Sequence, residues 1–294
     1  MVVHPATGNC NNTLVNALLF HTKNSLSDIN GIERPGIVHR IDKDTSGVIV
    51  ACKNNSSHKI LTDVFSKHNI KREYVAIVKG YPDSDKGLIN APIGRDKFNR
   101  LKMAVDSKNG KRAVTNFEVL EKMKGASYIK AVLETGRTHQ IRTHMAFIGN
   151  PLLGDDIYGG KDKRFEKGQL LHARLLGFIH PIKNEYMEFT ANLDDYFQNL
   201  KVGALFAYND DDSFPKLTVI ESVIHKDKSS ILVMCKRADG NWSIAGIWLN
   251  DKLYFIHFYL GSYSNKSEAD KAFNIKKDNT NLWSDGYAKS WNLN

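Results

Sequence analysis

The sequence is poor in the features that mark secreted, disulfide-bonded and membrane-spanning proteins. It has three cysteines, Cys10, Cys52 and Cys235, and they form no CxxC pair. Their odd number and wide separation argue against a disulfide framework or a zinc site, and fit a reducing cytoplasm. No apolar run approaches the roughly 20 residues that span a bilayer, and the start, MVVHPATGN, lacks the basic and apolar regions of a signal peptide. We therefore expect a cytoplasmic protein without a membrane segment.

The chain also lacks internal repeats and low-complexity tracts. Its 294 residues are 41% hydrophobic and 25% charged, which is ordinary for a globular protein of one large domain or two smaller ones. Positive charge is concentrated in residues 1–200, which hold 29 Lys and Arg against 21 Asp and Glu. Residues 201–294 hold 12 against 11. This excess fits either a solubilising surface or a polyanionic partner such as nucleic acid.

The composition changes near residue 200. All four tryptophans occur near the C-terminus, and the polar run 208–213, YNDDDS, has the character of a linker. We predict a boundary at residues 200–210 between a larger domain, residues 1–200, and a β-rich module, residues 210–294. Periodicity in the module predicts four strands and a helix, at 217–224, 231–236, 242–249, 253–259 and 266–275. Asp239-Gly240 and Asn250-Asp251 would supply two of its turns.

In the larger domain, helical and strand patterns are mixed. Helical spacing predicts helices at 13–20, 58–68 and 138–148, and Thr138 is the expected N-cap of the third. Strand-like runs occur at 36–38, 48–51, 74–78, 113–121, 127–134, 170–180 and 185–190. Because most connections are short, we predict an α+β fold with a mixed, mainly antiparallel sheet.

Ionisable side chains interrupt this apolar pattern in four stretches. They are HRIDKDTSG (39–47), KREYVAIVKG (71–80), GRTHQIRTH (136–144) and GNPLLGDDIYGG (149–160). Charges beside a core are costly unless they are paired. We therefore expect an acid of the first stretch to pair with an arginine of the third.

Together with LLHARLLGFIHP, these motifs resemble the ordered motifs of the RluA/RluD-type RNA pseudouridine synthases, over roughly residues 2–195. The resemblance implies an isomerase that converts uridine to pseudouridine in RNA, mostly large-subunit ribosomal RNA. It also implies that neither a cofactor nor a metal takes part. RNA would be the partner of a protein that we expect to be a monomer.

The resemblance also implies roles for individual residues. Asp42 falls on the catalytic aspartate, and Tyr74 falls on the tyrosine that stacks on the target base. Arg142 falls on the arginine that pairs with the aspartate. Arg40 falls on the residue that fills the space left by the extruded base. The motifs supply three further candidates for RNA contact and base flipping: His39, Arg137 and His139.

These residue types suit the chemistry. A uracil must leave the RNA stack before it can react, and Tyr74 would offer it an aromatic face worth roughly 1–3 kcal/mol. Asp42 must be ionised to attack the sugar or to remove its 2′ proton. Because burial favours a neutral carboxylic acid, a fixed cation such as Arg142 is needed beside it. Tyr74 is also a candidate acceptor for the C5 proton.

Other acids and histidines have simpler interpretations. Asp44 precedes Thr45-Ser46-Gly47 and is expected to be a turn residue. Asp155-Asp156 could be a metal-binding pair, but the neighbouring glycines favour a shaped loop. His139 and His144 are five residues apart, which does not suit two metal ligands on one helix face. We expect them to be structural or to contact RNA, and His172 to face the core.

Two other functions remain open at this point. One is a catalytically inactive RNA-binding or ribosome-assembly factor on the same fold. The chain starts inside a strand that family members usually begin earlier, so the N-terminal strand is expected to be truncated. The other is a glycosidase-like hydrolase that uses Asp42 and Asp44. Two residues apart in a turn, these acids are poorly placed for the roughly 5–9 Å separation that such enzymes need.

Overall fold

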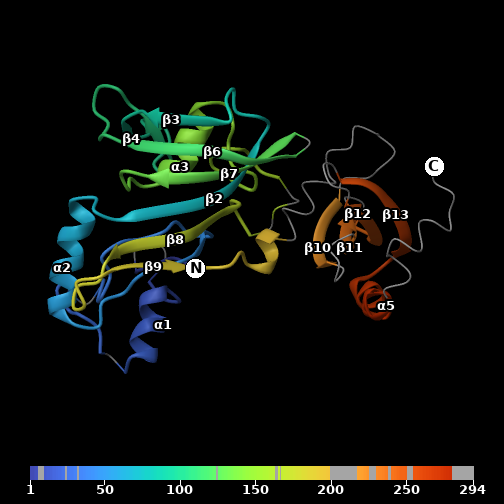
Figure 1. The fold of residues 1–294 in the computed structure, drawn as a ribbon, viewed down its shortest axis with the longest axis horizontal. Coiled ribbons are helices and arrows are strands. Elements are labelled where there is room, and N and C mark those ends of the chain that lie inside the picture. Colours follow the sequence, from blue (N-terminus) through green and yellow to red (C-terminus); the bar gives the residue numbers. More distant parts are fainter. Residues whose placement is uncertain are drawn as a thin grey trace. The chain divides into compact units, whose positions relative to one another are not determined.

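A computed structural model describes residues 1–5, 10–23, 25–31, 33–123, 125–162, 165, 167–198, 217–224, 230–237, 240–249 and 254–279. The chain divides into two compact units (Figure 1). The first consists of Met1–Lys122 and Ala126–Leu193, and the second of Met123–Gly125 and Asp194–Asn294. The domain boundary expected at 200–210 lies outside the described residues and stays a prediction.

A seven-stranded sheet forms the centre of the first unit, with the order β1-β8-β2-β7-β6-β3 and with β9 also paired to β8. The strands are β1 (Ser46–Gly47), β2 (Lys71–Lys79), β3 (Lys86–Asn90), β6 (Val114–Met123), β7 (Ala126–Leu133), β8 (Leu171–Ile179) and β9 (Tyr186–Thr190). Strand β2 is antiparallel to both β7 and β8, whereas β1 runs parallel to β8. The α+β class with a mixed, mainly antiparallel sheet is therefore confirmed.

Strand β2 lies inside this sheet, between β8 and β7, and is deeply buried. Its residues Val75, Ala76, Ile77 and Val78 are fully buried. A continuous apolar run is expected where a strand is covered on both faces. Ala76 and Val78 belong to the same apolar cluster as Ile141 and Met145 of helix α3. A smaller two-stranded sheet, β4 (Ile93–Arg95) with β5 (Met103–Val105), was not predicted.

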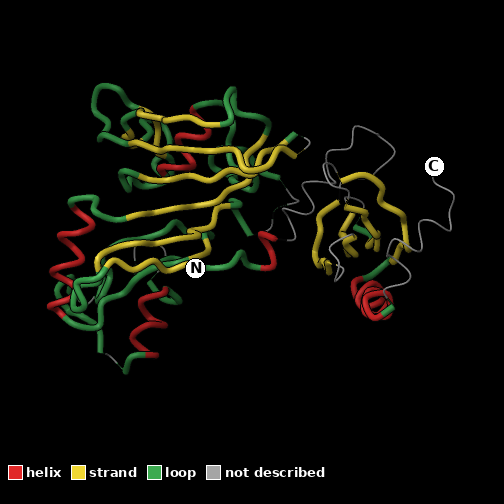
Figure 2. Tube along the Cα trace, viewed as in Figure 1, coloured by secondary structure: helices red, strands yellow, loops and turns green. Residues whose placement is uncertain are grey.

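Three helices accompany the sheet: α1 (Leu14–His21), α2 (Asn55–Ser66) and α3 (Gln140–Phe147) (Figure 2). Thr13, expected as the first helical residue, is the N-cap of α1, and its hydroxyl accepts a hydrogen bond from Asn16 N. Helix α2 begins three residues earlier than predicted because Asn54 provides its N-cap. The prediction that Thr138 caps α3 was wrong. The cap position is His139, whose backbone is left-handed with φ 53°.

The apolar runs 36–38 and 48–51 do not form the two strands that were predicted. They meet only in one bridge, between Ile37 and Ala51. Backbone N–H groups of the second run bond elsewhere: Val48 N donates to Ala173 O, and Val50 N donates to the ring of His39. The charged turn thus joins an irregular segment to the edge of β8.

The described part of the second unit includes a four-stranded antiparallel sheet and the helix α5. Its elements are β10 (Leu217–Ile224), β11 (Ser230–Arg237), β12 (Trp242–Leu249), β13 (Tyr254–Tyr263) and α5 (Lys266–Asp278). Ala269 and Phe273 of α5 pack against Leu232, Met234 and Ile244. The four strands and the helix were predicted, whereas the expected turn residues Asp239, Asn250 and Asp251 lie outside the described residues. Where the chain is described, no helix combines the length and apolarity required to cross a membrane.

Candidate active site

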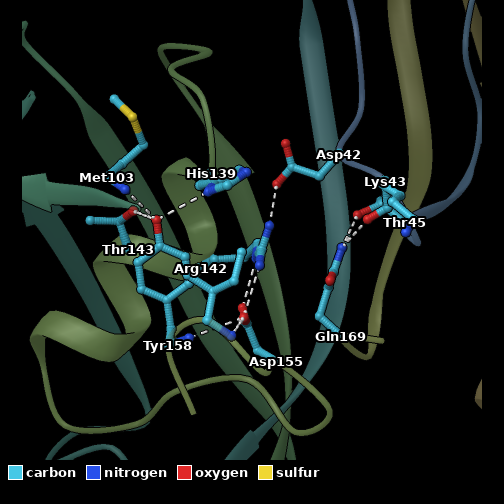
Figure 3. A network of polar contacts seen from close by, with 11 residues as sticks. Asp42, Lys43, Thr45, Met103, His139, Arg142, Thr143, Asp155, Tyr158 and Gln169 are labelled. Carbon is cyan, nitrogen blue, oxygen red and sulfur yellow. Dashed lines mark hydrogen bonds and ion pairs between the residues drawn. The ribbon is translucent and has the colours of Figure 1, made fainter. Parts of the chain in front are cut away.

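A tight turn presents Asp42 at the edge of the sheet. Thr45 N donates to Asp42 O at 3.1 Å, and Asp44 takes a left-handed backbone with φ 68°. The buried side chain of Gln169 holds the turn from below, since its Nε2 donates to Lys43 O at 2.6 Å and to Thr45 Oγ1 at 3.1 Å (Figure 3). Asp44 is therefore a turn residue, as expected, and Asp42 has a rigid support.

The residues after the turn are fastened to β8. Ser46 and Gly47 pair in parallel with His172 and Ala173. The ring of His172 is buried, and it bonds Ser46 Oγ at 2.8 Å through Nδ1 and Ala191 O at 3.2 Å through Nε2. His172 faces the core, as predicted, and it fixes the start of the segment that follows the turn.

Arg142 on α3 pairs with Asp42, but more tightly with a second acid. Its Nη1 lies 3.4 Å from Asp42 Oδ2. Its Nε and Nη2 donate to the two carboxylate oxygens of Asp155 at 2.6 and 2.8 Å. The Asp155 side chain is completely buried, and that of Arg142 is only 6% exposed. Asp155 thus anchors the guanidinium, which keeps one nitrogen directed toward Asp42 (Figure 3).

This role of Asp155 was missed, because its loop was interpreted only as a shaped loop. Its Oδ1 also accepts hydrogen bonds from Ile157 N and Tyr158 N. Burial alone would lower the pKa of Arg142, but the hydrogen bonds and charge of Asp155 raise it. One clue was present in the sequence: Asp155 closely follows an apolar pair in a motif stretch, and a charge beside a core needs a partner.

Tyr158 completes the support of Arg142. The ring lies 5.2 Å from the Arg142 guanidinium carbon, in cation–π contact. Its hydroxyl accepts from Met103 N at 2.9 Å and bonds Thr143 Oγ1 and His139 Nδ1, each at 3.1 Å. Burial raises the pKa of Tyr158, so the hydroxyl stays protonated. The hydroxyl therefore connects β5, α3 and the loop of Asp155 (Figure 3).

A cavity of about 390 Å³ lies beside Asp42. Every predicted site residue except Arg142 lines it: His39, Arg40, Asp42, Tyr74, Arg137 and His139. Arg142 is not part of the wall and holds Asp42 from the protein side. Cavities of this size accommodate small ligands or single groups of larger ones. The structure thus brings together residues from three separate motifs.

Tyr74 projects into this cavity from β2 and is partly buried. The pKa of Tyr74 is raised to about 12, chiefly by burial and with a smaller contribution from Asp42, against the opposing charge of Arg72. The phenol is therefore neutral near pH 7. A neutral phenol offers a stacking face, but it is a poor proton acceptor.

The remaining candidates differ in how freely they face the cavity. The ring of His39 stacks on Phe65 at 4.6 Å and accepts a hydrogen bond from Val50 N. Burial, with a contribution from Arg72, lowers the pKa of His39 to about 4, so this ring is neutral and has a structural role. Arg40 is exposed, and its nearest polar contact is His4 Nε2 at 3.4 Å.

His144 does not face the cavity. Its ring nitrogens bond Thr115 Oγ1 and Ala91 O, each at 2.9 Å, and the residue is completely buried. The structural interpretation of His144 is therefore correct, and the RNA-contact alternative is wrong for this residue. Within the part of the chain that the structure describes, no group of three or more His, Cys, Asp or Glu is arranged to hold a metal ion.

Comparison with known proteins identifies the family. The family model "RNA pseudouridylate synthase" matches residues 1–147, half of the chain. Ribosomal large subunit pseudouridine synthase D of Zymomonas mobilis is 50% identical over 209 residues, which cover 68% of this chain and 66% of that protein. The chain belongs to the RNA pseudouridylate synthase family. The resemblance inferred from the motifs is thus confirmed.

Other members of the family agree with this assignment. The uncharacterized RNA pseudouridine synthase YlyB of Bacillus subtilis is 51% identical over 195 residues, which cover 66% of this chain and 64% of that protein. The structure of human RNA pseudouridylate synthase domain containing 1 has a TM-score of 0.50 and 25% identity, over 63% of this chain and 75% of that chain. The chain spans just under two thirds of the length of the two bacterial relatives.

Proposed function

We propose that the protein isomerises uridine to pseudouridine in RNA and that large-subunit ribosomal RNA is its substrate. One observation carries the proposal: the Asp42 carboxylate lies at the wall of a cavity with Tyr74, within 3.4 Å of an arginine that a second acid anchors. The name of the relative from Zymomonas mobilis assigns it to the ribosomal large subunit, which supports this choice of substrate. We propose that the protein acts as a cytoplasmic monomer, without metal or cofactor.

In the proposed reaction the target uridine leaves the RNA stack and enters the cavity, and Arg40 takes its place in the stack. The base stacks on Tyr74. Asp42 either attacks C1′ and forms an ester as the N1–C1′ bond breaks, or removes the 2′ proton so that the N1–C1′ bond breaks and a C1′–C2′ double bond remains. The uracil turns and C5 bonds to C1′, which breaks the ester in the first case and is accompanied by return of the proton to C2′ in the second. The C5 proton is then transferred to a base, and N1 gains a proton.

The anchored guanidinium places a fixed positive charge beside Asp42. Arg142 Nη1 lies 3.4 Å from Asp42 Oδ2 while the other nitrogens keep their bonds to Asp155. Because the Tyr74 phenol is neutral, we assign it stacking and not proton transfer. We therefore assign removal of the C5 proton to the carboxylate of Asp42, which lines the cavity.

The experiment that tests the proposal compares wild type with Asp42→Asn in single-turnover reactions on transcripts of large-subunit ribosomal RNA. We expect wild type to form pseudouridine at a defined position. The variant should form none while it binds RNA within a few-fold of wild type, because binding depends mainly on phosphate contacts. Activity of the variant within ten-fold of wild type would refute the assignment.

A matched measurement addresses the inactive-factor alternative. Pseudouridines are mapped in ribosomal RNA from a strain that lacks the gene, from its parent, and from the strain supplied with Asp42→Asn. We expect one or more sites to disappear in the first and third samples. If all sites persist in every strain and the purified protein forms no pseudouridine, the non-catalytic function is favoured.

A further inference from the structure

Arg72 is a buried cation of the cavity that the proposed reaction does not use. It precedes Tyr74 by two residues on β2, so both side chains lie on the same face of the sheet, and both line the cavity. The residue is only 8% exposed. Its charge is therefore held largely away from water, next to the place where the base is expected to bind.

The guanidinium of Arg72 lacks a full set of partners. Its Nη2 donates to Glu134 O over 3.3 Å, and its buried Nε has no hydrogen-bond partner. Among the described residues no carboxylate lies within ion-pair distance of it. A buried charge without a counter-ion is costly, so a site of this kind is expected to receive an anion.

Gly136 makes room for this guanidinium. A Cβ atom at position 136 would overlap Arg72 Nη1, and the backbone of Gly136 is not in the left-handed region. The glycine is therefore needed for space and not for its conformation. The first residue of the stretch GRTHQIRTH, Gly136, thus leaves space for Arg72 of β2.

A second arginine, Arg137, lines the same part of the cavity as Arg72. Its Nε donates to Arg112 O. Arg137 adds to the burial that lowers the pKa of Arg72, although the Tyr74 ring opposes this shift. Of the nearby acids, Glu134 pairs at 3.0 Å with Arg112. The positive charges of Arg72 and Arg137 remain without an acidic partner within the described residues.

We propose that Arg72 and Arg137 bind a phosphate group of the RNA backbone adjacent to the flipped uridine. The proposal rests on the proposed function and adds a phosphate subsite to that active site. A phosphodiester is the anion that RNA brings to a protein. A guanidinium matches its oxygens with two donors. A carbonyl oxygen of the base would accept a hydrogen bond but would not neutralise the charge.

The test uses an 11-nucleotide RNA, five adenosines on each side of one uridine, with single phosphates replaced by uncharged methylphosphonates. The replaced linkage is 5′ of the uridine, 3′ of it, or distant from it. Dissociation constants are measured by fluorescence anisotropy for wild type, Arg72→Gln and a control, Arg174→Gln. The Arg174 side chain is 52% exposed, pairs with Glu73 and does not line the cavity.

We expect the affinity of the wild-type protein to depend on the charge of one of the two linkages beside the uridine. Neutralising it should weaken binding about 10-fold, as for loss of a charge-assisted hydrogen bond. Arg72→Gln should weaken binding to the unmodified RNA by a similar factor and show no further loss with that linkage neutral. Arg174→Gln should respond to each linkage as wild type does.

Two outcomes would overturn the proposal. In the first, Arg72→Gln and a neutral linkage together weaken binding by the product of their separate factors at all three linkage positions. The arginine would then not contact the phosphate beside the uridine. Alternatively, the effect of Arg72→Gln would disappear only when an abasic nucleotide replaces the uridine, which would assign the guanidinium to the base. Because these are binding measurements, they are separable from a failure to form pseudouridine.

Two further variants distinguish a binding role from a structural one. Arg72→Met removes an uncompensated buried charge, so the free protein should melt at the same or a higher temperature. A clearly lower melting temperature would make Arg72 structural and would refute the proposal. Gly136→Ala keeps the charge but displaces the guanidinium, and it should lose the response to the same linkage. Wild-type binding by this variant would also refute it.

Discussion

At the scale of single residues, Asp155 holds the arginine that faces Asp42, the proposed catalytic acid, although Asp155 does not line the cavity. We predict that Asp155→Asn lowers the free energy of unfolding by about 3–5 kcal/mol, because it breaks a buried ion pair. It should also abolish pseudouridine formation, since Arg142 loses its bidentate anchor. Urea unfolding and single-turnover assays provide the two measurements.

The neighbouring acid provides the control for this prediction. Asp156 is exposed, so Asp156→Asn should change the free energy of unfolding by no more than about 0.5 kcal/mol. If Asp155→Asn unfolds like Asp156→Asn and keeps full activity, Asp155 has no part in holding Arg142.

A second residue-scale prediction concerns pH. Because burial lowers the pKa of His39 to about 4, the unfolded chain takes up a proton near pH 6.5 that the folded protein does not yet bind. The stability from neutral His39 is complete above pH 6.5 and falls as the pH drops toward 4. Between pH 7 and pH 5, protonation of this group should lower the free energy of unfolding by about 2 kcal/mol.

His39→Gln tests this pH dependence, because the glutamine oxygen can accept the hydrogen bond from Val50 N in place of Nε2. The variant should lose about 2 kcal/mol less than wild type between pH 7 and pH 5. Urea unfolding at the two pH values measures both losses. Equal losses in the two proteins would show that His39 titrates normally in the folded state.

Sequence motifs led to the residues that line the cavity but not to the partners that hold them. Asp42, Tyr74 and Arg142 were named from their motifs, and the structure brings them together. The bonds of Arg142 to Asp155 depend on how a loop folds back on α3, which no local pattern encodes. The same is true of Gln169, which supports the turn from more than 120 positions away.

At the scale of elements, the site depends on the short parallel pairing of β1 with β8. Gly47 has φ 111°, and a Cβ atom there would overlap the carbonyl of Ala173. We predict that Gly47→Ala lowers the free energy of unfolding by about 2–4 kcal/mol through strain and lost pairing. Because the turn of Asp42 directly precedes β1, activity should also be lost.

Gly31 provides a matched control for this substitution. Its φ is 70°, but a Cβ atom there would meet nothing within 4 Å. Gly31→Ala should therefore lower the free energy of unfolding only by the cost of a left-handed alanine, about 1–2 kcal/mol, and leave activity unchanged. Chemical unfolding of both variants separates the cost of a left-handed alanine from the added cost of steric overlap with Ala173. Equal costs would contradict the importance of the β1–β8 contact.

The elements that periodicity predicted well are those whose pairing is local or whose burial is uniform. Strand β2 and the β8–β9 hairpin fall into this class. The segment 36–51 does not belong to this class. Its apolar residues cover the core without pairing as two strands, and its backbone N–H groups donate to β8 and to the ring of His39 instead. Strands β4 and β5 were missed because they have only three residues each, and β3, KGLIN, because it has no apolar alternation.

At the scale of the whole molecule, charge separates the two parts of the chain. Residues 201–294 hold 12 Lys and Arg against 11 Asp and Glu, although the chain as a whole has a net charge of +9. If RNA binding is electrostatic, log affinity falls with log salt in proportion to the number of neutralised phosphates. The arginines of the cavity, Arg40, Arg72 and Arg137, all belong to the first unit.

We predict that a chain of residues 1–200 binds ribosomal RNA fragments with nearly the same salt slope as the full chain and forms pseudouridine at the same site. Anisotropy titrations from low to high potassium chloride give the slope, and circular dichroism confirms that the shortened protein is folded. A folded 1–200 protein whose slope is smaller by several units would contradict the prediction. The basic residues of the second unit would then contact phosphates, and its near-neutral total would conceal a basic face opposite an acidic one.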